Sequence, residues 1–147
     1  MIGDGANTRN GTTTQGRCLC GAVGWSFAGE IPDATICNCT ACRRYGALWA
    51  YDWDGHGIRI DDPKGRLTAF TRGPGSPLSF NFCGDCGSVV SWRGLKPDAD
   101  GRIRIAVNLR LAEDPEAVAD IPLLRFEGLH SFEDLPVDGR RVRDAWF

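Results

Sequence analysis

The chain of 147 residues lacks both a long apolar segment and an excess of positive charge. No run approaches the roughly 20 apolar residues that a membrane-spanning helix needs. Lysine and arginine number 17 against 19 aspartates and glutamates, and the net charge is -2 at pH 7. This balance does not provide the basic surface that nucleic-acid binding requires. We therefore expect neither a membrane nor a nucleic acid as a partner.

An apolar signal-peptide core is also missing from the opening run MIGDGANTRNG. Export would expose cysteines to an oxidising compartment, whereas cytosolic thiols stay reduced. The sequence therefore predicts a cytoplasmic protein.

Histidine and long amphipathic helices are scarce as well. His56 and His130 are the two histidines, and each lies in turn-like sequence, so neither is assigned a ligand or catalytic role. Short helices are expected over 40–45 and 114–119, the second with Asp114 as its N-cap and Pro115 as its first residue.

Alternating apolar and polar residues, typical of half-buried strands, dominate the remaining pattern. The alternation is clearest over 23–28, 78–82 and 103–109, and further strands are expected over 48–53, 58–61, 66–71 and 88–92. Glycine, proline and aspartate turns separate these segments. The sequence therefore predicts a mainly β fold with little helix, arranged as a single domain over 16–147 after a flexible N-terminal tail over 1–15.

Seven cysteines fall into three tight clusters. They are CLC at Cys18 and Cys20, CNCTAC at Cys37, Cys39 and Cys42, and CGDC at Cys83 and Cys86. Pairs at this spacing can converge on one tetrahedral zinc ion, whose sulfur ligands lie about 2.3 Å from the metal. A disulfide scaffold is the alternative. The odd number of cysteines and the strain of bridging close neighbours argue against it.

The seven thiols divide naturally into four and three. Joining the first cluster to the last gives a saturated structural set, Cys18, Cys20, Cys83 and Cys86. The remaining three, Cys37, Cys39 and Cys42, would leave a fourth position for water or substrate, as in a catalytic zinc site. We therefore expect two Zn²⁺ ions per chain, one closed and one open.

Three motifs carry a resemblance to a known family. The runs GRCLCGAV over 16–23, CNCTACRR over 37–44 and FCGDCGS over 82–88 closely resemble the glutathione-dependent formaldehyde-activating family, also called the centromere protein V/GFA domain. The resemblance extends from Gly16 to the closing run SFEDLPVDGRRVRDAWF. It implies a zinc-stapled β-tent of several small antiparallel sheets. Where the family usually has histidine between the first two cysteines of the second motif, this chain has Asn38.

The resemblance also implies an activity and the roles of the two cysteine sets. In the family the first and last cysteine pairs hold a structural zinc and the central trio holds the second. The implied enzyme is a carbon–sulfur lyase acting on S-hydroxymethylglutathione, with other thiol adducts left open. A non-enzymatic zinc-stapled binding or chaperone-like module of the same fold is the alternative. An open three-cysteine site favours chemistry, because a scaffold gains nothing from a vacant position.

Two arginines follow the second motif directly. Arg43 and Arg44 could contact the carboxylates of glutathione, or could form a solvated pair that stabilises the end of a helix. Tyr45, Trp49 and Trp53 could wall a pocket, although aromatic residues of a β protein more often lie in its core.

Overall fold

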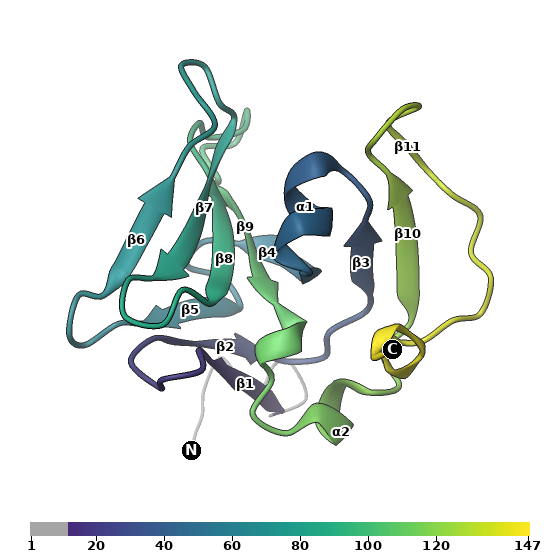
Figure 1. The fold of residues 1–147 in the computed structure, drawn as a ribbon, viewed down its shortest axis with the longest axis horizontal. Helices are drawn as coiled ribbons and strands as arrows, with labels where there is room; N and C mark the ends of the chain where they lie inside the picture. Colours follow the sequence, from purple (N-terminus) through teal and green to yellow (C-terminus); the bar gives the residue numbers. More distant parts are fainter. Residues whose placement is uncertain (1–11) are drawn as a thin grey trace.

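The computed structural model describes residues 12–147, which form two β-sheets and four short helical segments (Figure 1). The smaller sheet has the order β1-β2-β5 and the larger has the order β11-β10-β3-β4-β9-β8-β7-β6. The strands are β1 (Thr13–Arg17), β2 (Gly24–Ala28), β3 (Ala34–Cys37), β4 (Leu48–Trp53), β5 (Ile58–Asp61), β6 (Leu67–Phe70), β7 (Leu78–Cys83), β8 (Val89–Gly94), β9 (Arg104–Asn108), β10 (Leu123–Glu127) and β11 (Glu133–Asp134). The α-helices are α1 (Thr40–Tyr45) and α2 (Pro115–Val118), and the 3-10 helices are η2 (Leu109–Leu111) and η3 (Val142–Ala145).

The mainly β prediction is confirmed, and several expected elements have the predicted bounds. Strands β4 and β5 and helix α1 coincide with the expected ranges 48–53, 58–61 and 40–45. Helix α2 begins as predicted, because the Asp114 carboxylate accepts a hydrogen bond from the Glu116 backbone N–H at 3.0 Å. None of the helices in the described part of the chain has the length and apolar character needed to span a membrane.

Strand β1 begins at Thr13, before residue 15, where the N-terminal tail was expected to end. Residues 13–15 were expected to belong to that tail, but they pair with β2, while residues 1–11 lie outside the described part. The register places Gly16 opposite Trp25, and any Cβ at position 16 would collide with the indole ring. Glycine therefore allows the ring to lie against β1, where it is buried. This run of threonine, glutamine and glycine has no hydrophobic alternation that would predict a strand.

Strands β3, β10 and β11 were not expected, and β3 and β10 are decisive for the site. They form the one parallel pair in the described sheets (Figure 1). Its register places Cys37 beside Phe126. The two strands are short and lack clear alternation, so the hydrophobic pattern could not distinguish them from loops. Their pairing brings the second cysteine motif next to the last quarter of the chain.

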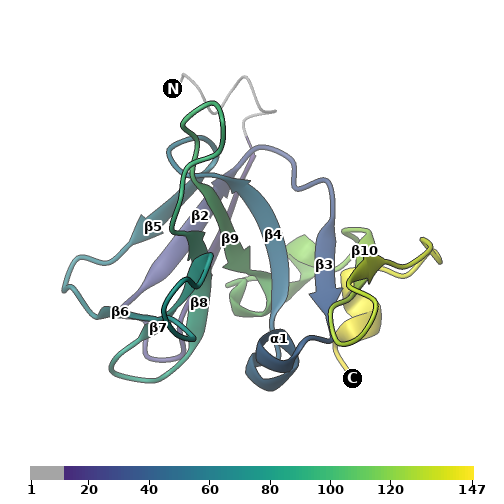
Figure 2. The ribbon, with the colours of Figure 1, turned by 90° about the horizontal axis from the view of Figure 1, so that it is seen from above.

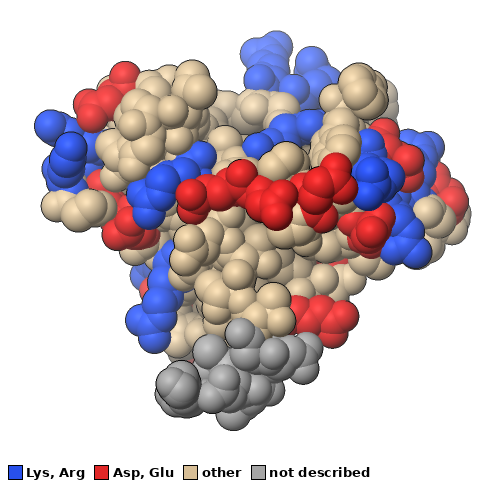
Figure 3. Space-filling model, turned by 90° about the horizontal axis from the view of Figure 1, so that it is seen from below, with Lys and Arg blue, Asp and Glu red and all other residues tan. Residues whose placement is uncertain are grey.

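The main core lies between the two sheets. Its largest buried side chains include Trp25 and Phe27 from β2, Leu48 from β4 and Ile58 from β5. Helix α1 links the end of β3 to the start of β4 and lies at one end of these strands (Figure 2). On the face seen from below in Figure 3, acidic side chains form a row with basic side chains at both ends. The described residues on this face therefore form no continuous basic patch.

Candidate metal centres and the adjoining cavity

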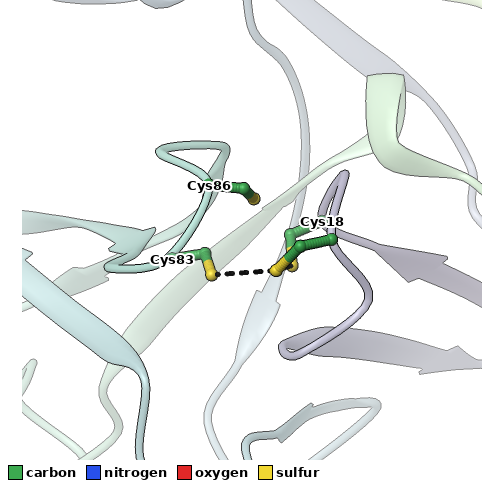
Figure 4. A group of neighbouring side chains, drawn as sticks. Cys18, Cys83 and Cys86 are labelled. Carbon is green, nitrogen blue, oxygen red and sulfur yellow. Dashed lines mark hydrogen bonds between the residues drawn. The ribbon is translucent and has the colours of Figure 1, made fainter.

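The first and last cysteine clusters meet at one point. Cys18 and Cys20 lie in the turn after β1, Cys83 ends β7 and Cys86 lies in the turn that follows, and all four sulfurs lie within 4.8 Å of one another. The side chains of Cys18, Cys83 and Cys86 converge from two separate turns (Figure 4). The group joins the small sheet to the large one.

The spacing of these sulfurs fits zinc. Cys20 Sγ lies 3.7 Å from both Cys18 Sγ and Cys83 Sγ. Four sulfurs at about 2.3 Å from a tetrahedral zinc would lie about 3.8 Å apart. A disulfide requires about 2.05 Å, and all seven cysteines are free. The four thiols can therefore hold a metal ion, as the cluster spacing predicted.

Backbone turns hold the four thiols in place. Gly21 and Gly87, each directly after a cysteine pair, have φ of 84° and 81°, a left-handed conformation that favours glycine. Ser88 connects the two turns, because its hydroxyl accepts from the Leu19 N–H at 3.1 Å and lies 3.3 Å from Cys86 Sγ. The hydrogen bond from Ser88 lowers the pKa of Cys86 to about 6, with further help from backbone N–H groups. This thiol is therefore readily available as the thiolate that a metal requires.

The central trio also converges. Cys37 ends β3, Cys39 is the N-cap of α1, and Cys42 lies within that helix, with the three sulfurs within 4.8 Å of one another. Cys39 Sγ accepts from the Cys42 N–H at 3.3 Å, and Cys37 Sγ accepts from the Cys39 N–H at 3.4 Å. In residues 12–147 no histidine, aspartate or glutamate joins these three sulfurs as a fourth ligand. The group can hold a metal ion with a position left open.

The three thiols differ in acidity. Burial raises the pKa of Cys42, although the Trp49 indole N–H opposes this by donating to its sulfur at 3.3 Å. Burial also raises the pKa of Cys37. The pKa of Cys39 is lowered in spite of its partial burial, because the Cys42 N–H and neighbouring thiols donate to its sulfur. Cys39 is thus the member of the trio that ionises most easily.

Asn38, which lies between Cys37 and Cys39, connects the trio to the chain beyond β10. Its Nδ2 donates to Glu127 Oε1 at 2.6 Å, and its Oδ1 accepts from the Gly128 N–H at 2.8 Å. The other Glu127 oxygen accepts from the N–H groups of His130 and Ser131, at 2.7 and 2.8 Å. The Asn38 side chain and these backbone donors hold the pKa of Glu127 at about 2.

Gly128 allows this turn to lie directly on the trio. A Cβ at position 128 would lie 2.8 Å from Cys37 Sγ and 2.9 Å from Cys39 Cβ, closer than such atoms can approach. No local pattern in the sequence identifies Glu127 or Gly128, because their role depends on a partner about 90 residues away.

A cavity of about 440 Å³ opens beside the trio. Cys37 and Cys42 line it, together with apolar residues and four arginines, Arg43, Arg110, Arg125 and Arg140. Of the two arginines singled out in the sequence, Arg43 faces this cavity. Arg44 lines a different hollow, with Tyr45, Phe70 and Arg72.

The remaining candidates lie away from the cavity wall. Trp49 is buried in the core and contacts the trio through its hydrogen bond to Cys42, whereas Trp53 stacks under the guanidinium of Arg102. His56 pairs with Asp52 at 3.0 Å, and the His130 side chain is 83% exposed. Neither histidine joins a cysteine group.

Comparison with known proteins gives a family and a structural neighbour. The family model for "Glutathione-dependent formaldehyde-activating enzyme" matches residues 13–120. A crystal structure of a Rhodobacter sphaeroides protein, a Northeast Structural Genomics target, is 26% identical, with a TM-score of 0.55. The alignment covers 74% of this chain and 98% of that one. The search of curated proteins found no match. The matched range contains all seven cysteines but ends before β10.

Proposed function

The chain belongs to the glutathione-dependent formaldehyde-activating enzyme family, and from this premise we propose that it is a zinc-dependent carbon–sulfur lyase. Its substrate would be S-hydroxymethylglutathione or another thiol adduct. The observation that carries the proposal is the position of the three-cysteine group. Its sulfurs converge on one point at the wall of a cavity large enough for a small molecule.

The two cysteine groups would have separate tasks. Cys18, Cys20, Cys83 and Cys86 would hold a structural zinc, and Cys37, Cys39 and Cys42 would hold the second. When bound there, zinc supplies Lewis acidity to a thiol sulfur or an aldehyde oxygen. The Trp49 N–H and the Cys42 N–H donate to two of the three sulfurs and fix their positions.

The proposed reaction joins glutathione to formaldehyde without any oxidant or reductant. The thiol sulfur forms a bond to the carbonyl carbon, the π electrons of the C=O bond move to oxygen, and the thiol proton ends on that oxygen. Cleavage reverses these changes. The contribution of the chain is to place the thiol and the aldehyde side by side in the cavity and to keep them there.

Exchange NMR of the hydroxymethyl protons tests the proposal. Zinc-loaded wild type should speed approach to the S-hydroxymethylglutathione equilibrium from both sides without moving it. The uncatalysed addition is facile, so Cys39→Ser at equal concentration is the necessary control and should give only the background rate. Equal rates for the two proteins over a range of concentrations would overturn this substrate assignment and favour the binding-module alternative.

A further inference from the structure

The cavity beside the trio is lined by positive charge that the protein itself does not neutralise. Four arginines line it, and none of its lining residues is acidic. The one carboxylate nearby is shared: Asp138 Oδ2 lies 3.3 Å from Arg125 Nε and 2.9 Å from Arg140 Nε. Arg125 and Arg140 therefore share a single carboxylate as their ion-pair partner.

Arg110 and Arg43 have no carboxylate partner at all among residues 12–147. Arg110 Nη1 donates to the Ala145 carbonyl at 2.9 Å, a neutral acceptor. Its backbone is fixed, because Asn108 Oδ1 accepts from the Arg110 N–H at 3.1 Å and from the Leu48 N–H at 3.2 Å. Burial lowers the pKa of Arg110, because desolvation disfavours the charged form of a cation that has no counter-charge. An anionic ligand beside Arg110 would stabilise that charged form.

The arginines come from parts of the chain that the sequence does not connect. Arg43 lies in α1 and Arg110 in η2, whereas Arg125 lies in β10 and Arg140 precedes η3. The last two lie beyond residue 120, where the family match ends. Two of the four arginines that line the cavity therefore come from the closing segment, outside the matched range.

We propose that the cavity recognises the carboxylates of an acidic thiol, with Arg110 and Arg43 as specificity-determining residues. The inference rests on the proposed function and deepens it by naming the residues that would make the site specific for a thiol that carries carboxylates. Three thiolates around one divalent ion leave a net negative charge that would repel an anionic substrate. The four arginines offset this repulsion and can bind carboxylates through paired N–H donors. A thiol anchored in this way would have its sulfur end near Cys37 and Cys42.

Kinetics with two thiols test the specificity. Glutathione has two carboxylates, whereas its diethyl ester keeps the thiol and has none. Arg110→Gln should raise the KM for glutathione about tenfold, the effect of losing a charge-assisted hydrogen bond, with little change in the KM for the ester. Arg59→Gln removes an exposed positive charge from β5, away from this cavity, and should change neither value.

A second variant guards against a structural effect. Arg110 also donates to the Ala145 carbonyl, so its loss loosens the C-terminal segment, whereas the Arg43 side chain makes no such bond within residues 12–147. Arg43→Gln should therefore also raise the KM for glutathione more than the KM for the ester, and its thermal melt should be unchanged. An equal KM increase for both thiols in both arginine variants would overturn the inference.

Binding without turnover separates this inference from the proposed lyase activity. S-methylglutathione keeps both carboxylates but has no free thiol, and its binding to zinc-loaded protein can be followed by calorimetry. Wild type should bind it about tenfold more tightly than Arg110→Gln or Arg43→Gln. That result without any acceleration of exchange would refute the lyase and support the carboxylate site. Acceleration of exchange with no arginine-dependent binding would overturn the carboxylate site and leave the lyase intact.

Discussion

Asn38 donates a hydrogen bond of 2.6 Å to Glu127 across 89 residues of sequence, and this contact joins the second cysteine motif to the closing segment of the chain. Asn38 lies between Cys37 and Cys39, so its orientation is coupled to the trio. Glu127 in turn accepts from the backbone N–H groups of His130 and Ser131 and orders the turn after β10. The side chain at position 38 therefore acts as a structural tie, a role that an amide can fill because it both donates and accepts.

Asn38→Ala should raise the pKa of Glu127 from about 2 toward its usual value near 4.5, because the carboxylate loses its first donor. Because the pKa of Glu127 is lower in the folded state than in the unfolded state, its carboxylate stabilises the wild-type fold at pH values above about 4.5. This contribution is lost as the pH falls from about 4.5 toward 2. Carbon-13 NMR of the Glu127 carboxyl over this pH range measures the shift. His130→Ala keeps the backbone donor at that position and should move the pKa less. An unchanged Glu127 pKa in Asn38→Ala would contradict the tie.

Gly128→Ala should weaken metal binding at the trio alone, because the added methyl group meets Cys37 Sγ and Cys39 Cβ. We expect its zinc content after mild chelation to approach one ion per chain. Leu129→Ala removes part of an exposed neighbouring side chain and should keep the wild-type content. Elemental analysis after gel filtration compares the two. Two tightly held zinc ions in Gly128→Ala would show that the turn does not press on the site.

Fully loaded protein should carry close to two zinc ions per chain, since the sulfurs form one group of four and one of three. A chelator with a coloured zinc complex should remove them in two phases. The faster phase would belong to the trio, because an open three-ligand site releases metal more readily than a closed one. Cys42→Ser should abolish the fast phase. A protein that binds at most one zinc in excess metal would disprove the two-site assignment.

Cys83→Ser should destabilise the fold by more than about 4 kcal/mol, because Cys83 is fully buried and helps join the two sheets. Cys39→Ser should cost about 1 kcal/mol or less, since serine can still cap α1. Denaturant unfolding of the two zinc-loaded variants gives both values. Equal losses would mean that the central trio is structural as well.

Local patterns were sufficient for much of this molecule. Closely spaced cysteines can converge whenever a tight turn separates them, so both thiol groups were predictable from spacing and counting alone. Strands β4 and β5 were predictable because their apolar residues and flanking turn residues are encoded within each segment, and helix α1 was expected as a short helix directly after Cys39. That the two groups bind zinc, and which role each thiol would have there, are predictions from coordination chemistry.

The surroundings of the trio were decided by tertiary structure. The parallel pairing of β3 with β10 has no signature in either strand, because their partner residues lie nearly 90 positions apart. That pairing places Glu127 and Gly128 against the trio and Arg125 at its cavity, and Arg110 arrives separately from the end of β9. A single arginine in a sequence reads as a solvated surface charge. Only the fold decides which arginines share a cavity and how few carboxylates are left to pair with them.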